Sequence, residues 1–105
     1  LTALQNLQFY NNKLTTLDTN IFAGLTALQY LYLHKNQLTT LDPKLLTELT
    51  ALQDLYLSDN KLTEINPKMF SGLVALQELD LEKNKLTREN VRSIRVEIPK
   101  VCIWI

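Results

Sequence analysis

The sequence has few of the residues on which catalytic sites and disulfide-linked domains depend. It contains one cysteine, Cys102, and one histidine, His34. A single cysteine excludes an internal disulfide and indicates no redox compartment. Ser58 and Asp59 lie one repeat from His34, but such a grouping arises easily by chance, and no nucleophile elbow or phosphate-binding loop is present. We therefore expect no enzyme, no catalytic residue, no metal site and no cofactor.

The sequence also lacks an excess of charge and a long apolar run. Lysine and arginine number 11, aspartate and glutamate number 11, and the formal net charge is zero. A neutral chain has no broad electrostatic attraction to nucleic acid or to an anionic membrane. No run of 18 apolar residues occurs, so we expect no membrane insertion in this segment and no nucleic-acid partner.

Proline is scarce, and two of the three prolines occupy equivalent places. Pro43 and Pro67 each follow an aspartate or asparagine, which is the order of a helix cap and a first-turn residue. This order predicts short helical or 3-10 turns over roughly 43–48 and 67–72.

Leucine, by contrast, is abundant and recurs at a fixed interval. The pattern L-x-x-L-x-L-x-x-N-x-L appears in full from Leu28, Leu52 and Leu76, and from Leu4 with Phe9 in place of one leucine. Its asparagines are also 24 residues apart: Asn12, Asn36, Asn60 and Asn84. Agreement at so many offsets indicates an internal repeat.

This pattern resembles the leucine-rich repeat family in its 24-residue typical form. The resemblance implies an α/β fold, a leucine-rich repeat solenoid with a curved parallel β-sheet on the concave face and short helical or 3-10 turns on the convex face. One repeat cannot bury its leucines alone, whereas stacked neighbours can. We expect one leucine-rich repeat domain over residues 1–105, with coils starting near 4, 28, 52, 76 and 98.

The last coil is expected to be atypical, because the template fails after Leu86. Thr87 is a plausible cap for a helix near 88–95, with an inward-facing apolar side. The apolar residues that follow repeat an earlier spacing, which aligns Ile98, Val101 and Ile103 with Leu76, Leu79 and Leu81.

The first residue also fits the template. Leu1 matches Leu25, Leu49 and Leu73, which close a preceding coil. We therefore interpret the chain as a fragment of a longer array. Uncapped solenoid ends expose core, so end-to-end self-association is a hypothesis.

The repeated asparagines stand in the template in line with the inward-facing leucines, so their polar side chains need an explanation. A polar side chain there is costly unless it is hydrogen-bonded. The resemblance implies an asparagine ladder in which these side chains bond to backbone groups. We expect all four ladder asparagines to be structural.

Residues between the leucines face the other way along a strand and would line the concave face. All four tyrosines fall in these gaps, whereas the three phenylalanines fall on the leucine frame. Tyrosine is enriched in binding surfaces, although it also simply favours strands, and acidic residues can merely keep a sheet soluble. We expect these residues to bind the ligand: Tyr10, Tyr30, Tyr32, His34, Asp54, Tyr56, Glu78, Asp80 and Glu82.

The sequence is similar to segments of Toll-like receptors, lamprey variable lymphocyte receptors and amphioxus leucine-rich repeat proteins. This implies a protein-recognition module that binds a protein ligand through its concave face, within a secreted or cell-surface protein of immunity or adhesion. Related repeats also occur inside cells and in bacteria, so a cytoplasmic location is the alternative. The alternative function is a structural or assembly scaffold with no dedicated concave ligand.

Overall fold

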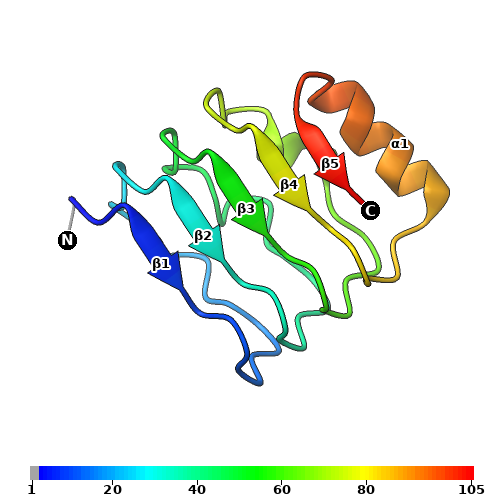
Figure 1. The fold of residues 1–105 in the computed structure, drawn as a ribbon, viewed down its shortest axis with the longest axis horizontal. Helices are drawn as coiled ribbons and strands as arrows, with labels where there is room; N and C mark the ends of the chain where they lie inside the picture. Colours follow the sequence, from blue (N-terminus) through cyan, green and yellow to red (C-terminus); the bar gives the residue numbers. More distant parts are fainter. Residues whose placement is uncertain (1–2) are drawn as a thin grey trace.

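Five short strands run parallel and lie side by side in chain order (Figure 1). The computed structural model describes residues 3–105, so Leu1 lies outside the described residues. The strands are β1 (Asn6–Gln8), β2 (Tyr30–Tyr32), β3 (Asp54–Tyr56), β4 (Glu78–Asp80) and β5 (Cys102–Trp104). Each pairs only with its neighbours in sequence, which confirms the expected parallel sheet of a solenoid.

The strand register follows the 24-residue period through the last coil. Leu31 pairs with Leu55, Leu55 with Leu79, and Leu79 with Ile103. The sequence alignment of Ile103 with Leu81 was therefore wrong by two residues. It took Ile98 as the start of a strand segment, whereas Ile98 is the C-cap of a helix, and its N–H donates to the carbonyl of Ile94.

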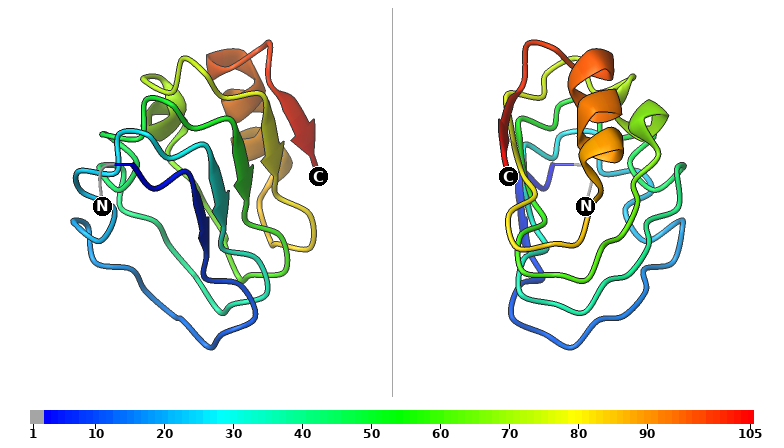
Figure 2. Two further views of the ribbon diagram at one scale, coloured as in Figure 1. Left: turned by 60° about the vertical axis from the view of Figure 1, so that its left-hand side comes forward. Right: turned by 90° about the vertical axis from the view of Figure 1, so that its right-hand side faces the viewer.

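The convex side carries short turns and two helical segments (Figure 2). The 3-10 helix η1 (Pro67–Phe70) follows Asn66, whose side-chain oxygen accepts a hydrogen bond from the Lys68 N–H at 3.0 Å. Residues 43–48 form hydrogen-bonded turns, not a regular helix. The proline signal thus places both turns correctly, and only the second tightens into a helix.

Helix α1 (Arg88–Glu97) covers the convex side of the last coils (Figure 1). The Thr87 hydroxyl accepts the Asn90 N–H at 3.1 Å, as expected of its N-cap. The Asn90 side chain then makes two hydrogen bonds to the backbone of Ile65, at 2.7 and 2.8 Å. A salt bridge of 3.1 Å also joins Lys68 to Glu97. These contacts fix the helix to the preceding coil.

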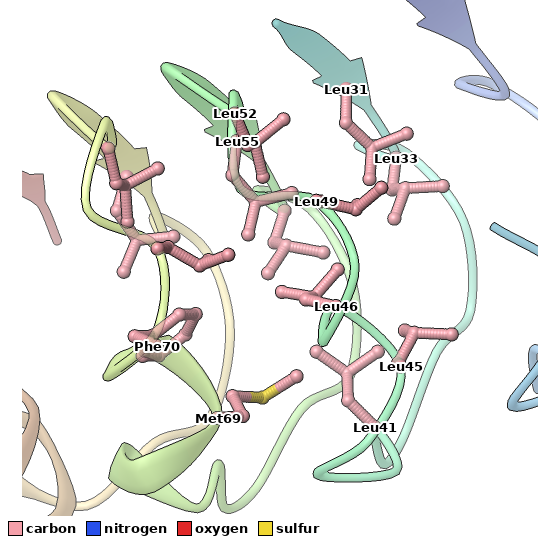
Figure 3. Packing of buried hydrophobic residues seen from close by; sticks show 14 of the residues in the cluster. Leu31, Leu33, Leu41, Leu45, Leu46, Leu49, Leu52, Leu55, Met69 and Phe70 are labelled. Carbon is pink, nitrogen blue, oxygen red and sulfur yellow. The ribbon is translucent and has the colours of Figure 1, made fainter. Parts of the chain in front are cut away.

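The core lies between the sheet and the convex turns, where the leucines of successive coils stack on one another (Figure 3). Leu31, Leu55 and Leu79 are fully buried, and each strand leucine contributes roughly 1.5–3 kcal/mol by this burial. Phe70 projects into the same core from the convex side. The sheet is therefore held by a continuous apolar column rather than by any single coil.

The ladder asparagines join each coil to the one before it. The Asn60 amide donates to the carbonyls of Leu33 and Leu57, both at 3.0 Å, and its oxygen accepts the Leu38 N–H at 3.1 Å. Asn36 is bonded in the same manner, and both side chains are buried. These bonds satisfy backbone groups that the turn after each strand would otherwise leave buried without partners.

Each ladder asparagine follows a residue with left-handed backbone geometry. Asn11, Lys35, Asp59 and Lys83 all have φ between 56° and 58°. Asparagine and aspartate tolerate this region, but lysine pays a steric penalty there. The left-handed residue turns the chain sharply enough to bring the asparagine under the strand ends.

Candidate functional site: the concave face

The outward side of the sheet, here called the concave face, consists of three columns of side chains. The strand register defines the first two, and the residues two positions after each strand form the third. The first column contains Asn6, Tyr30, Asp54, Glu78 and Cys102. The second contains Gln8, Tyr32, Tyr56, Asp80 and Trp104. The third contains Tyr10, His34, Ser58 and Glu82. All nine residues expected to bind a ligand lie in these columns.

The corrected register changes the last coil of the concave face. Cys102 takes the position that the sequence alignment gave to Lys100, and Trp104 takes the position given to Cys102. Lys100 lies in the turn before β5. Cys102 is exposed. The aromatic ring of Trp104 therefore belongs to the second column, beside Asp80.

Four aromatic rings form one cluster on the first three coils. Tyr10 stacks on His34, and Tyr32 stacks on Tyr56, each pair with centroids 4.8 Å apart and planes within 6°. The distance equals the spacing of neighbouring strands, so the register itself aligns the rings. His34 also meets Tyr32 and Tyr56 edge-on. We call these four residues the aromatic cluster; Tyr30 lies beside it in the first column.

His34 is held in the cluster by ring contacts. Its Nδ1 is buried and makes no hydrogen bond within the described residues. A histidine that acts as a general base normally has its ring oriented by a hydrogen bond from one ring nitrogen to a carboxylate or carbonyl. The surroundings of His34 supply aromatic packing in place of such a partner.

An acidic patch adjoins the aromatic cluster on β3 and β4. Asp54, Glu78, Asp80 and Glu82 form this patch, and the first three are half-buried. The only ion pair within residues 3–105 joins Lys68 and Glu97 on the convex side, so the patch carboxylates are not neutralised by a basic neighbour. The concave face thus presents unpaired negative charge next to aromatic surface.

Tyr56 connects the cluster with the acidic patch. Its hydroxyl lies 3.5 Å from Asp54 Oδ2, at the limit of a hydrogen bond. The pKa of the Tyr56 phenol is raised above its ordinary value, first by desolvation and then by the charges of Asp54 and Glu78. Both causes oppose formation of a phenolate, so Tyr56 remains a neutral ring with a polar tip.

Two structural features of this fold were missed by sequence reasoning. The Asn90 hydrogen bonds to Ile65 had no repeat signal, because Asn90 occurs in the one coil that leaves the template. The left-handed residues did have a signal, since each one immediately precedes a ladder asparagine, and two of the four are asparagine or aspartate. Neither feature contributes a side chain to the aromatic cluster.

The described chain also has a groove away from the concave face. A shallow groove of about 630 Å³ runs along the convex side between α1 and the preceding turns, lined mainly by polar side chains such as Thr63, Glu64 and Ser93. Within residues 3–105, no group of three histidine, cysteine, aspartate or glutamate side chains could hold a metal ion. No helix in that range combines the length and apolarity needed to cross a bilayer.

Solved structures with the same fold come from several kinds of organism. A leucine-rich repeat protein of Leptospira interrogans shares 33% identity over 97% of this chain, with a TM-score of 0.89. Toll in the Toll–Spätzle complex of Drosophila shares 30% identity over 90% of this chain, with a TM-score of 0.78. The TLR13–ssRNA13 complex gives 27% identity over 95% of this chain, with a TM-score of 0.85. This chain spans 25%, 13% and 14% of those chains, respectively.

A search of curated proteins finds no match, whereas a family model does match the sequence. The model described as "Leucine rich repeat" matches residues 1–38 and 27–86, which together cover most of the chain. With the parallel sheet, the 24-residue register and the buried leucine column, this match identifies the chain as a member of the leucine-rich repeat family.

Proposed function

We propose that this domain is a protein-recognition module that binds a protein ligand through its concave face. The observation that carries the proposal is the aromatic cluster, whose large rings remain partly exposed on a rigid sheet. Tyr10 is 44% exposed, and Tyr32 and Tyr56 are half-buried. Such rings offer contact area at little cost in side-chain entropy, because neighbouring rings already restrict their rotation.

The similar structures support a role in recognition. Toll is seen with Spätzle, in a complex described as a hub in development and innate immunity, and TLR13 is seen with single-stranded RNA. For this chain, a protein ligand fits better than RNA, because the acidic patch repels phosphate. We propose that the parent protein is secreted or displayed on the cell surface and acts in immunity or adhesion. The Leptospira protein shows that the same coils also occur in bacteria.

Site-specific photo-crosslinking in the protein's native setting tests the proposal. The photoreactive residue p-benzoylphenylalanine would replace Tyr32 on the concave face or Val74, which is 87% exposed and lies outside the sheet. We expect one discrete protein to crosslink from position 32 and not from position 74. Crosslinking from position 74 alone would contradict the proposal and favour the scaffold function.

A scaffold that assembles end to end is the second candidate. Trp104 and Ile105 leave about half of their surface exposed on the last coil. On the first coil, an apolar hollow of about 330 Å³ is lined by residues including Leu7, Phe9 and Ile21. Association of these surfaces would make the sedimentation coefficient rise with concentration, and Ile105→Asp would abolish that rise. A monomer at all concentrations would exclude this mode of assembly.

A further inference from the structure

The second column of the concave face places an aromatic residue on each side of Asp80. Tyr56 is its partner on β3, and Trp104 is its partner on β5. Neighbouring strands are about 4.8 Å apart, so the two aromatic positions are separated by about 9.6 Å, with only a short side chain between them. A flat group in contact with a ring on each side needs about 7–8 Å. We call the space over Asp80, between Tyr56 and Trp104, the slot.

Both neighbours of Asp80 in the second column are aromatic. Tyr32 covers one face of the Tyr56 ring at 4.8 Å, in nearly parallel planes, so the opposite face of Tyr56 is turned toward β4. Trp104 is 49% exposed on the edge strand of the sheet. Aromatic faces carry partial negative charge and attract cations.

The floor of the slot is negatively charged. Asp80 Oδ1 accepts the N–H of Glu82 at 3.1 Å, and this bond holds the carboxylate in place while Oδ2 has no hydrogen bond in the described part of the chain. Glu78 lies two positions before Asp80 on the same outward side of β4. Neither carboxylate forms an ion pair with Lys83 or Lys85, the basic residues nearest to them in sequence.

We propose that the slot binds an arginine side chain presented by a basic segment of the protein ligand. A guanidinium is planar, stacks on aromatic faces and pairs with carboxylates, whereas a lysine ammonium cannot stack. The charge complementarity also excludes acidic segments and phosphate groups from the slot. This inference rests on the proposed function, because it names the chemistry by which the concave face would recognise its ligand.

The slot contains its own reporter, since Trp104 is the only tryptophan in the sequence. The probe is a capped Gly-Arg-Gly peptide, titrated at low salt while the emission of Trp104 is recorded. We expect a saturable change, weaker binding of Gly-Lys-Gly, and no saturation with the uncharged citrulline analogue. Binding should weaken as salt is added, because salt screens the attraction between the guanidinium and the carboxylates.

Two variants and a matched control separate charge from stacking. Asp80→Asn keeps the Oδ1 acceptor that bonds to Glu82 and removes the charge. Because Asp80 is half-buried, the change should weaken binding at least about five-fold, the most that a fully exposed ion pair contributes. Tyr56→Leu removes one aromatic side of the slot and should also weaken binding. Glu64→Gln removes one negative charge on the convex side and should leave binding unchanged.

The inference fails if arginine and citrulline peptides produce the same response, or if Asp80→Asn binds the arginine peptide as tightly as the unchanged chain does. Its failure is distinguishable from failure of the proposed function. A protein that crosslinks from position 32 equally well with and without Asp80→Asn would overturn the arginine slot and leave protein recognition standing.

Discussion

The two sides of the sheet differ in how uniform their side chains are from coil to coil. On the inward side, Leu31, Leu55 and Leu79 are identical and fully buried. On the outward side, the residues that follow them are Tyr32, Tyr56 and Asp80, two phenols and a carboxylate. An inward side chain packs on its own copies in the neighbouring coils, so one shape must repeat. An outward side chain faces solvent on one side, so its identity is less constrained from coil to coil.

The largest expected effect comes from breaking the inward side at its centre. Leu55→Ala leaves a cavity in the middle of the leucine column and should lower the free energy of unfolding by about 3 kcal/mol. Urea denaturation measures the loss. A change below about 1 kcal/mol would show that the column is not the main source of stability. Such a result would remove the contrast between the two sides.

The asparagine ladder allows a second comparison, between a buried and an exposed position. Asn60→Ala leaves the buried Leu38 N–H without a partner and removes one of the two asparagine hydrogen bonds to each of the carbonyls of Leu33 and Leu57, so it should cost about 2 kcal/mol. The matched control is Asn12→Ala, because Asn12 is exposed and donates only to Phe9 and Tyr10 in its own coil. Equal losses in the two variants would contradict a ladder that works by joining coils.

Replacing the lysine that precedes a ladder asparagine should increase stability, because this position has left-handed backbone geometry. Lys35 has φ of 57°, a region that lysine enters only at a cost. Lys35→Asn should therefore raise the free energy of unfolding by about 0.5 kcal/mol, since asparagine tolerates this geometry. The control Lys61→Asn changes the same charge at an exposed position with negative φ. A gain in both variants would assign the effect to charge rather than to the backbone.

The smallest expected effect is a shift in the titration of one exposed carboxylate. The pKa of Asp42 is lowered, first by the Lys44 N–H and then by the Thr19 hydroxyl, which donates to Oδ2 at 2.8 Å. Asp42 therefore contributes stability above its unfolded pKa, and this is lost as pH falls through the lower folded value. In an NMR titration, Thr19→Val should raise the pKa of Asp42. An unchanged pKa would show that the Thr19 contact between adjacent coils is not formed.

The repeat made most of the fold predictable from sequence. Leucines at fixed offsets predict parallel strands, because each repeat must place its apolar residues against the same residues of the next. Pro43 and Pro67 located the convex turns, and Thr87 located the start of α1. Prediction failed where the repeat ended. Ile98 has strand-like apolar spacing, but α1 runs through Glu97 and uses Ile98 as its cap.

The candidate site was less predictable than the fold. Alternation along a strand separates inward from outward side chains, so Tyr32 and Tyr56 could be assigned to one surface. That Tyr10 stacks on His34 depends also on side-chain rotamers, which sequence spacing does not specify. Trp104 entered the second column only after the register placed Ile103 beside Leu79. Sequence patterns therefore predict which face of the sheet a side chain occupies, whereas the side chains it contacts are known only from the structure.

The central claim is that the inward leucines provide stability and the outward tyrosines provide recognition. It is tested most directly by one variant in which Tyr32 and Tyr56 are both alanine. Urea denaturation and crosslinking from p-benzoylphenylalanine at position 10, where Tyr10 lies beside His34, would be measured on the same preparation. Loss of one stacked pair should lower the free energy of unfolding by only about 1–2 kcal/mol, while crosslinking to the ligand disappears. A chain that no longer folds, or one that still crosslinks as strongly, would contradict the assignment of stability to the leucines and recognition to the tyrosines.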